Sequence, residues 1–89
     1  MFDITYTDRF AKNYRKLQTM ERKQAKAKIE ILKNNPNHPS LRTKKVMGID
    51  GLFEASVNMS IRILWYYEKS AIIILLDIGR HEMLNNLSS

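Results

Sequence analysis

The order of periodic segments predicts an α+β domain in which two helices cover one face of an antiparallel sheet. An alternating segment at residues 2–6 precedes two stretches of helical spacing within residues 8–34. Three strand-like segments then follow at residues 53–57, 61–67 and 71–78, joined by short polar turns, which indicates an antiparallel meander. Because helices and strands occupy separate parts of the chain, the α+β class is favoured over alternating α/β architectures.

The length and composition predict one globular unit over residues 1–89. Eighty-nine residues allow a single core, and 44% hydrophobic with 27% charged residues is typical of globular domains. The absence of cysteine excludes disulfides and thiolate zinc sites, and no metal or other cofactor is expected. The longest apolar run, residues 71–76, is far shorter than the roughly 20 residues that span a bilayer. With no secretory signal pattern at its start, we expect a cytoplasmic protein without a membrane partner.

The N-terminal elements follow from local signals. Apolar and polar residues alternate over residues 2–6, as in a half-buried strand. Thr7 is a typical N-cap for the first helix, and Thr19 is a second start signal. Pro36 disfavours a helical Asn35 and therefore ends the second helix there. Since few residues separate the two helices, they should form an antiparallel hairpin.

The C-terminal half is expected to hold the sheet. Residues 35–52 form a connection with turn residues at both ends and a basic centre, long enough to be functional. In the strand at 61–67, alternation assigns Trp65 and Tyr67 to the core and places Tyr66 on the same face as Arg62. The last strand is apolar at successive positions, as expected of a strand covered on both faces.

The positive charge is concentrated in one half of the chain. The net charge is +6, and residues 9–45 hold twelve of the fifteen basic residues with only two acids. A concentrated field of this sign favours nucleic acid, an anionic membrane surface or an acidic protein as partner. The alternative is a solvated lysine-rich helix face without a partner.

Two polar residues at strand positions could carry chemistry. Arg62 interrupts an apolar strand, so it is exposed on the open face, paired with Asp77 or Glu54, or part of a site. His81 lies just after the last strand, and histidine is the residue type best suited to proton transfer near neutral pH. The chain has no phosphate-binding glycine loop, Gly-x-Ser-x-Gly or His-Glu-x-x-His motif. RNA cleavage by a neighbouring 2′-hydroxyl fits these residue types, because it needs proton-transfer groups and cations but no metal.

Four segments occur in a distinctive order: LRTKKV at 41–46 followed by Gly48, GLF at 51–53, IRILWY at 61–66, and residues 73–79 followed by His81. In their order and spacing the chain resembles the RelE/ParE superfamily of toxins from type II toxin–antitoxin systems. The RelE and YafQ branch is the most similar, and the resemblance covers nearly the whole chain. It implies a RelE-like fold and a toxin that cleaves mRNA on the ribosome without a metal and so inhibits translation. It also implies an acidic antitoxin in a toxin–antitoxin hetero-oligomer, and a role such as plasmid stabilisation.

The resemblance also implies a site. Arg62 matches the strand arginine that stabilises the phosphorane, and His81 matches the residue that acts as general acid or base. Tyr66 could stack on a base, and the basic residues around it could clamp phosphates. The expected substrate-binding residues are Lys44, Lys45, Arg80, Arg42 and Tyr66.

Four residues depart from the pattern of the family. Lys44 stands where close relatives have histidine, and Asn85 stands where many have an aromatic residue. Glu54 and Ser56 stand where the most basic members carry lysines. These changes affect catalysis more than phosphate binding. They keep two alternatives open: a ParE-like inhibitor of DNA gyrase without catalysis, and a catalytically degenerate module that binds only its antitoxin.

Overall fold

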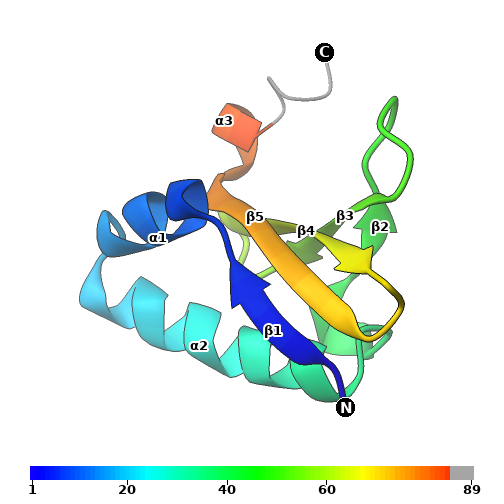
Figure 1. The fold of residues 1–89 in the computed structure, drawn as a ribbon. Coiled ribbons are helices and arrows are strands. Elements are labelled where there is room, and N and C mark those ends of the chain that lie inside the picture. Colours follow the sequence, from blue (N-terminus) through cyan, green and yellow to red (C-terminus); the bar gives the residue numbers. More distant parts are fainter. Residues whose placement is uncertain (85–89) are drawn as a thin grey trace.

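A computed structural model of the chain describes residues 1–84 and shows two helices packed on one face of a five-stranded sheet (Figure 1). The expected α+β class is therefore confirmed. No helix within these residues is long and apolar enough to cross a membrane. The elements in chain order are β1 (Asp3–Tyr6), α1 (Asp8–Arg15), α2 (Thr19–Asn34), the 3₁₀ turn η1 (Pro39–Leu41), β2 (Lys44–Lys45), β3 (Leu52–Ser56), β4 (Ile61–Glu68), β5 (Ile72–Arg80) and the short helix α3 (His81–Leu84).

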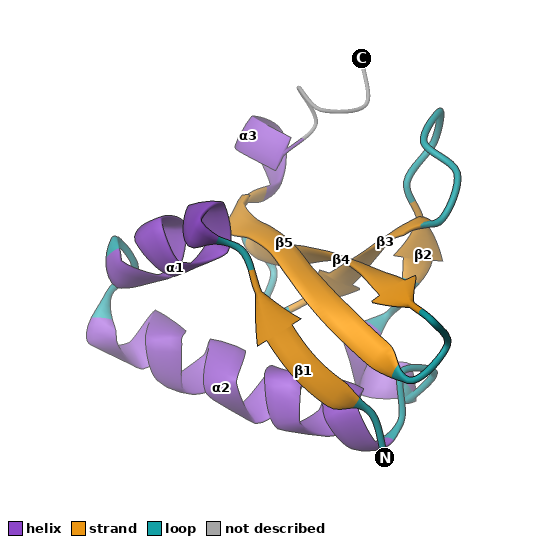
Figure 2. Ribbon diagram, in the orientation of Figure 1, coloured by secondary structure: helices purple, strands orange, loops and turns teal. Residues whose placement is uncertain are grey.

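The two long helices begin and end near the expected residues. The Thr7 hydroxyl accepts a hydrogen bond from the Phe10 backbone N–H at 3.0 Å, which confirms Thr7 as the N-cap of α1. The same hydroxyl donates to the Leu76 carbonyl at 2.7 Å and so joins the start of α1 to β5. After α2, Asn35 is extended, as the following Pro36 requires. α1 and α2 double back on one another at residues 16–18 (Figure 2).

The sheet has the strand order β1-β5-β4-β3-β2. β3, β4 and β5 form the expected antiparallel meander. Two features were not predicted. β1 pairs in parallel with β5, so the sheet is mixed. The expected connection over 35–52 is wrong at residues 44–45, which form β2 and pair with Phe53 and Glu54; a two-residue strand is too short to show an alternating pattern.

The main core lies between the helices and one face of the sheet. Trp65 is 1% exposed there, as expected, but Tyr67 is 38% exposed and lies at the margin of the core. Its assignment to the core was therefore wrong, because Tyr67 is near the end of β4, beyond the cover of the helices. The other residues of this buried cluster are Phe10, Ala25, Leu32, Leu41, Ala55, Val57, Ile61, Ile63, Ile73, Leu75 and Ile78.

The opposite face of the sheet, here called the open face, carries a smaller apolar cluster. Leu52 and Leu64 are buried in it, and Val46, Tyr66 and Leu76 pack against them. β5 therefore has apolar cover on both faces, as its sequence predicted, although helices contribute to only one.

A bulge in β5 changes which face its side chains occupy. Leu64 lies opposite Asp77, whereas the next residue, Trp65, lies opposite Leu75, so Leu76 is an extra residue without a partner. Asp77 is 2% exposed and accepts a hydrogen bond from the Asn13 amide at 2.7 Å. Its other carboxylate oxygen lies 2.9 Å from Nε of Arg9. Asp77 therefore anchors α1 to the bulge and is not the partner of Arg62.

Replacing the anchor should destabilise the fold. We expect Asp77→Ala to lower the free energy of unfolding by about 1–3 kcal/mol, because the part-buried amide of Asn13 and the buried N–H of Ile78 lose their acceptor. Asp3→Ala, an exposed position on β1, is the control and should change it by less than about 0.5 kcal/mol. Urea unfolding of both variants checks this. Equal losses in the two variants would show that the anchor contributes nothing.

Candidate functional site

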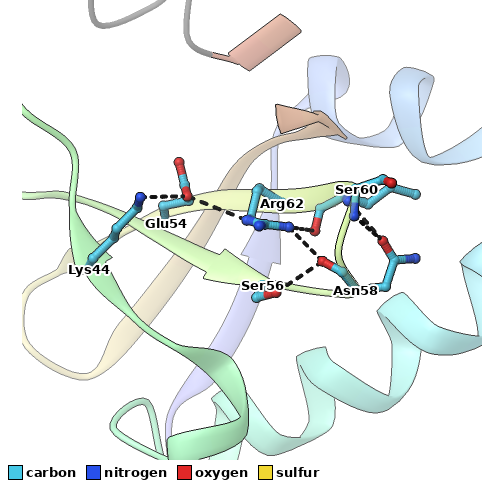
Figure 3. Close-up of polar contacts among 7 residues, drawn as sticks. Lys44, Glu54, Ser56, Asn58, Ser60 and Arg62 are labelled. Carbon is cyan, nitrogen blue, oxygen red and sulfur yellow. Dashed lines mark hydrogen bonds and ion pairs between the residues drawn. The ribbon is translucent and has the colours of Figure 1, made fainter. Parts of the chain in front are cut away.

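The polar side chains of the open face meet where β2, β3 and β4 lie side by side (Figure 3). One carboxylate oxygen of Glu54 lies 3.6 Å from Nζ of Lys44 and 3.6 Å from Nε of Arg62. The side chain of Lys44 is 64% exposed, that of Arg62 19% and that of Glu54 10%. A half-buried guanidinium and an exposed ammonium therefore share one buried carboxylate.

The β3–β4 turn holds the guanidinium of Arg62 in place. Nη1 of Arg62 donates to the carbonyl of Asn58 at 2.5 Å and to that of Ile61 at 3.1 Å. The Asn58 side chain in turn accepts hydrogen bonds from the backbone N–H groups of Ser60 and Ile61, which fixes the turn (Figure 3). Arg62 lies between Ser56 on β3 and Gly79 on β5.

The charges of this cluster are unequal. Two cations face one carboxylate, so one positive charge remains unbalanced. The ion pair of the exposed Lys44 is of the kind that contributes about 0–1 kcal/mol, so an incoming anion could replace Glu54 as its partner at little cost. The cluster can therefore bind a phosphate group while a carboxylate stays beside it.

Glu54 was expected as a possible partner of Arg62, and that pairing is confirmed. It was not among the expected site residues. The signal was present, since an acid stands at a buried position between Phe53 and Ala55. The sequence alone could not show that this carboxylate is buried beside two cations.

His81 lies at the end of the sheet where Arg62 is held. Its backbone N–H donates to the carbonyl of Ser60 at 2.8 Å, next to the start of β4. Nδ1 of the ring is buried and has no hydrogen-bond partner among residues 1–84. Because Nδ1 is buried, a bound substrate could exchange a proton only with Nε2.

The remaining expected residues divide between the two sides of the sheet. Tyr66 is half-buried on the open face, four residues along β4 from Arg62, as predicted. Lys45 pairs opposite Phe53 and is exposed, and alternation along β2 places it on the other face from Lys44. Arg42 is exposed just before β2, with a left-handed φ of 49°.

Arg80 lies on the helix side. Its Nη1 is 3.0 Å from a carboxylate oxygen of Glu21, in the first turn of α2. The backbone N–H of Gln18 hydrogen-bonds to Glu21 and lowers the pKa of its carboxyl, with a further contribution from Arg80. The structure thus joins Lys44 and Arg62 through Glu54, places Tyr66 farther along the same face, and directs Arg80 toward α2.

Two other expectations concern metals and Asn85. Within the described part of the chain, no three His, Asp or Glu side chains are close enough together to hold a metal ion. Asn85 lies outside the described residues.

The fold matches those of solved toxins. A chain of the E. coli DinJ–YafQ toxin–antitoxin complex superposes with a TM-score of 0.77 at 18% identity, over 93% of this chain and 96% of that one. For the E. coli RelBE toxin–antitoxin complex the TM-score is 0.73 at 18% identity, over 90% and 96%. For the YoeB/ParE toxin of Agrobacterium tumefaciens it is 0.77 at 10% identity, over 90% and 99%. No family model and no curated protein matches the chain.

These similarities extend over nearly the full length of both chains in each comparison. The protein therefore has the fold of the RelE/ParE-superfamily toxins, and the fold that the sequence resemblance implied is confirmed.

The hydrogen bond from the Gln18 N–H to Glu21, together with the contact of Arg80, should make stability depend on pH. Because the folded-state pKa of Glu21 is lowered, its stabilising contribution is present above about pH 4.5 and is lost as the pH falls below that value. We expect the difference in unfolding free energy between the parent and Glu21→Gln to be larger at pH 7 than at pH 3. Urea unfolding at both pH values measures it, with Glu30→Gln on the exposed side of α2 as a control for helix propensity. A difference independent of pH would contradict this role.

Proposed function

We propose that this protein is the toxin of a toxin–antitoxin pair and inhibits translation by cleaving mRNA on the ribosome without a metal ion. The observation that carries the proposal is the Arg62 guanidinium, held half-buried on the open face beside Glu54 and Lys44. The shared fold with toxins solved in complex with antitoxins supports the toxin assignment.

The reaction needs four contributions from the protein. The 2′-oxygen of a ribose attacks the adjacent phosphorus as the bond to the 5′-oxygen breaks, which leaves a 2′,3′-cyclic phosphate and a 5′-hydroxyl. A base must take the proton of the 2′-hydroxyl, and an acid must protonate the leaving 5′-oxygen. Cations must stabilise the charge on the non-bridging oxygens, and the strand must be held in line.

The residues at the open face can supply the base, the acid and the cations that the reaction needs. Arg62 would stabilise the phosphorane, since its hydrogen bonds to the β3–β4 turn hold it before the substrate arrives. Lys44 would exchange Glu54 for a phosphate oxygen, and the freed carboxylate of Glu54 could accept the 2′-proton. His81 would protonate the leaving group through Nε2. Arg80 would reach the RNA only by leaving Glu21.

The basic half of the chain would bind the larger partners. Exposed lysines and arginines on α1, on α2 and in the turn between them give the helix side a basic surface suited to ribosomal RNA or to an acidic antitoxin. The exposed residues of this surface include Lys12, Arg15, Lys16, Lys23 and Lys26.

A ParE-like gyrase inhibitor is the second candidate. The pairing of both open-face cations with Glu54 favours it, because a site whose charge is already partly neutralised attracts phosphate less strongly. The YoeB/ParE toxin has the same fold. In this case the protein would act by binding alone.

Arg62→Ala should abolish most of the cleavage. Loss of the guanidinium should reduce the rate about 10²-fold or more, because it acts on charge that develops in the transition state. His81→Ala should lower the rate by a similar factor if His81 is the acid. Mapping mRNA 5′ ends on translating ribosomes measures both, and Glu30→Ala on the exposed side of α2 is the control. Circular dichroism must show that each variant is folded.

If the folded variants cut as well as the parent, this site assignment is wrong. A parent that cuts no mRNA but blocks supercoiling by gyrase would replace the endonuclease with the ParE-like function. A parent inactive in both assays that still binds the acidic product of an adjacent gene would leave the antitoxin-binding module.

Glu54→Gln should separate binding from catalysis. Without the carboxylate, Lys44 and Arg62 lose their anionic partner, so affinity for single-stranded RNA should rise. The salt dependence should also steepen, since each added phosphate contact contributes about 0.7 to the slope. Cleavage should fall about 10²-fold or more if Glu54 accepts the proton. Salt-series binding and the cleavage assay test this against Glu30→Gln; unchanged cleavage would remove Glu54 from the mechanism.

A further inference from the structure

A second feature of the open face is a cavity of about 400 Å³ between the β2–β3 turn and strands β4 and β5. Its volume is within the range of small-ligand sites. Most of its lining is apolar or aromatic, and Asp50 is its one charged residue. The lining includes Ile49, Asp50, Leu52, Tyr66, Tyr67 and Leu76.

The fold builds this cavity from two irregular segments. The turn over residues 46–51 is closed by a hydrogen bond from the Val46 N–H to the Leu52 carbonyl at 2.9 Å, and Gly51 takes a φ of 80° that favours glycine. On the other side, the β5 bulge supplies Leu76, which packs in the open-face cluster. The position of Asp50 is therefore fixed by a closed turn.

Two polar groups in the cavity are free to bind a ligand. Among residues 1–84, neither the carboxylate of Asp50 nor the hydroxyl of Tyr66 makes a hydrogen bond or ion pair within the protein. Tyr66 lies on the same face of β4 as Arg62, four residues away, which corresponds to about 13 Å along the strand. One RNA strand could therefore place a phosphate at Arg62 and a nearby base at Tyr66.

We propose that this cavity binds a guanine base of the RNA, stacked on Tyr66 with its Watson–Crick edge donating to Asp50. The inference rests on the proposed function in one respect, that RNA is the molecule bound at the open face. Stacking on an aromatic ring is the usual way in which proteins bind unpaired bases. The bound base would set which position of the mRNA is cut.

The carboxylate of Asp50 selects guanine by its chemistry. An ionised carboxylate only accepts hydrogen bonds, so the base must present donors. Guanine has two adjacent donors, N1–H and the N2 amine, which match the two carboxylate oxygens. Adenine and cytosine each place one amine beside a ring nitrogen that accepts, and uracil places one N–H between two carbonyls. Those acceptors would face the negative charge of Asp50.

Binding of short RNAs to the whole protein tests the assignment directly. In NMR titrations we expect UUGUU to bind about tenfold or more tightly than UUUUU, UUAUU or UUCUU, with shifts at Asp50 and Tyr66. Asp50→Asn should remove the preference for guanine. Tyr66→Ala should weaken binding of UUGUU by about tenfold, whereas Tyr66→Phe should retain most of it because the ring can still stack. Asp3→Asn, on the far edge of the sheet, is the charge-matched control.

The remaining outcomes separate this inference from the proposed function. Equal binding of all four RNAs, or a preference that survives Asp50→Asn, would overturn the guanine site whether or not the protein cuts mRNA. Selective binding that depends on Asp50 in a protein that cuts no mRNA would support the site and reject the endonuclease. If GMP alone shifts Asp50 while the four RNAs bind equally, the cavity takes a free nucleotide and the RNA assignment is overturned.

Discussion

The bulge at Leu76 in β5, anchored by Asp77, determines how the rest of the structure is arranged. The extra residue allows Leu75 and Ile78 to face the helices while Leu76 packs on the open face. Asp77 then holds α1 through Arg9 and Asn13. One local irregularity thus couples the helix layer, the sheet register and a wall of the open-face cavity.

The two faces of the sheet use charge differently. On the helix side, Arg80 pairs with an acid in the first turn of α2 and so joins the end of β5 to the helices. On the open face, Lys44 and Arg62 share the single carboxylate of Glu54. Arg80 and Arg62 are both strand arginines, but their side chains lie on opposite faces of the pleated sheet. They therefore have different partners.

The candidate site shows where prediction from sequence succeeds and fails. Alternation along β4 correctly placed Tyr66 on the same face as Arg62, because the side-chain period of a strand is local. The buried position of Glu54 depends on β2, a strand of two residues that no periodic pattern marks. The assignment of Tyr67 to the core failed because burial depends on how far the helices extend over the sheet.

The sequence by itself determined the α+β class, the helix boundaries at Thr7 and Pro36, and the meander, since all of these follow from periodicity, capping and turn residues close together in the chain. The tertiary structure alone decided the parallel pairing of β1 with β5, because it joins residues about 70 positions apart. It also decided the bulge and the partner of each charged residue. The bulge and these pairings depend on which side chains, distant in the sequence, are packed within hydrogen-bond distance of one another. Local sequence patterns do not predict such contacts.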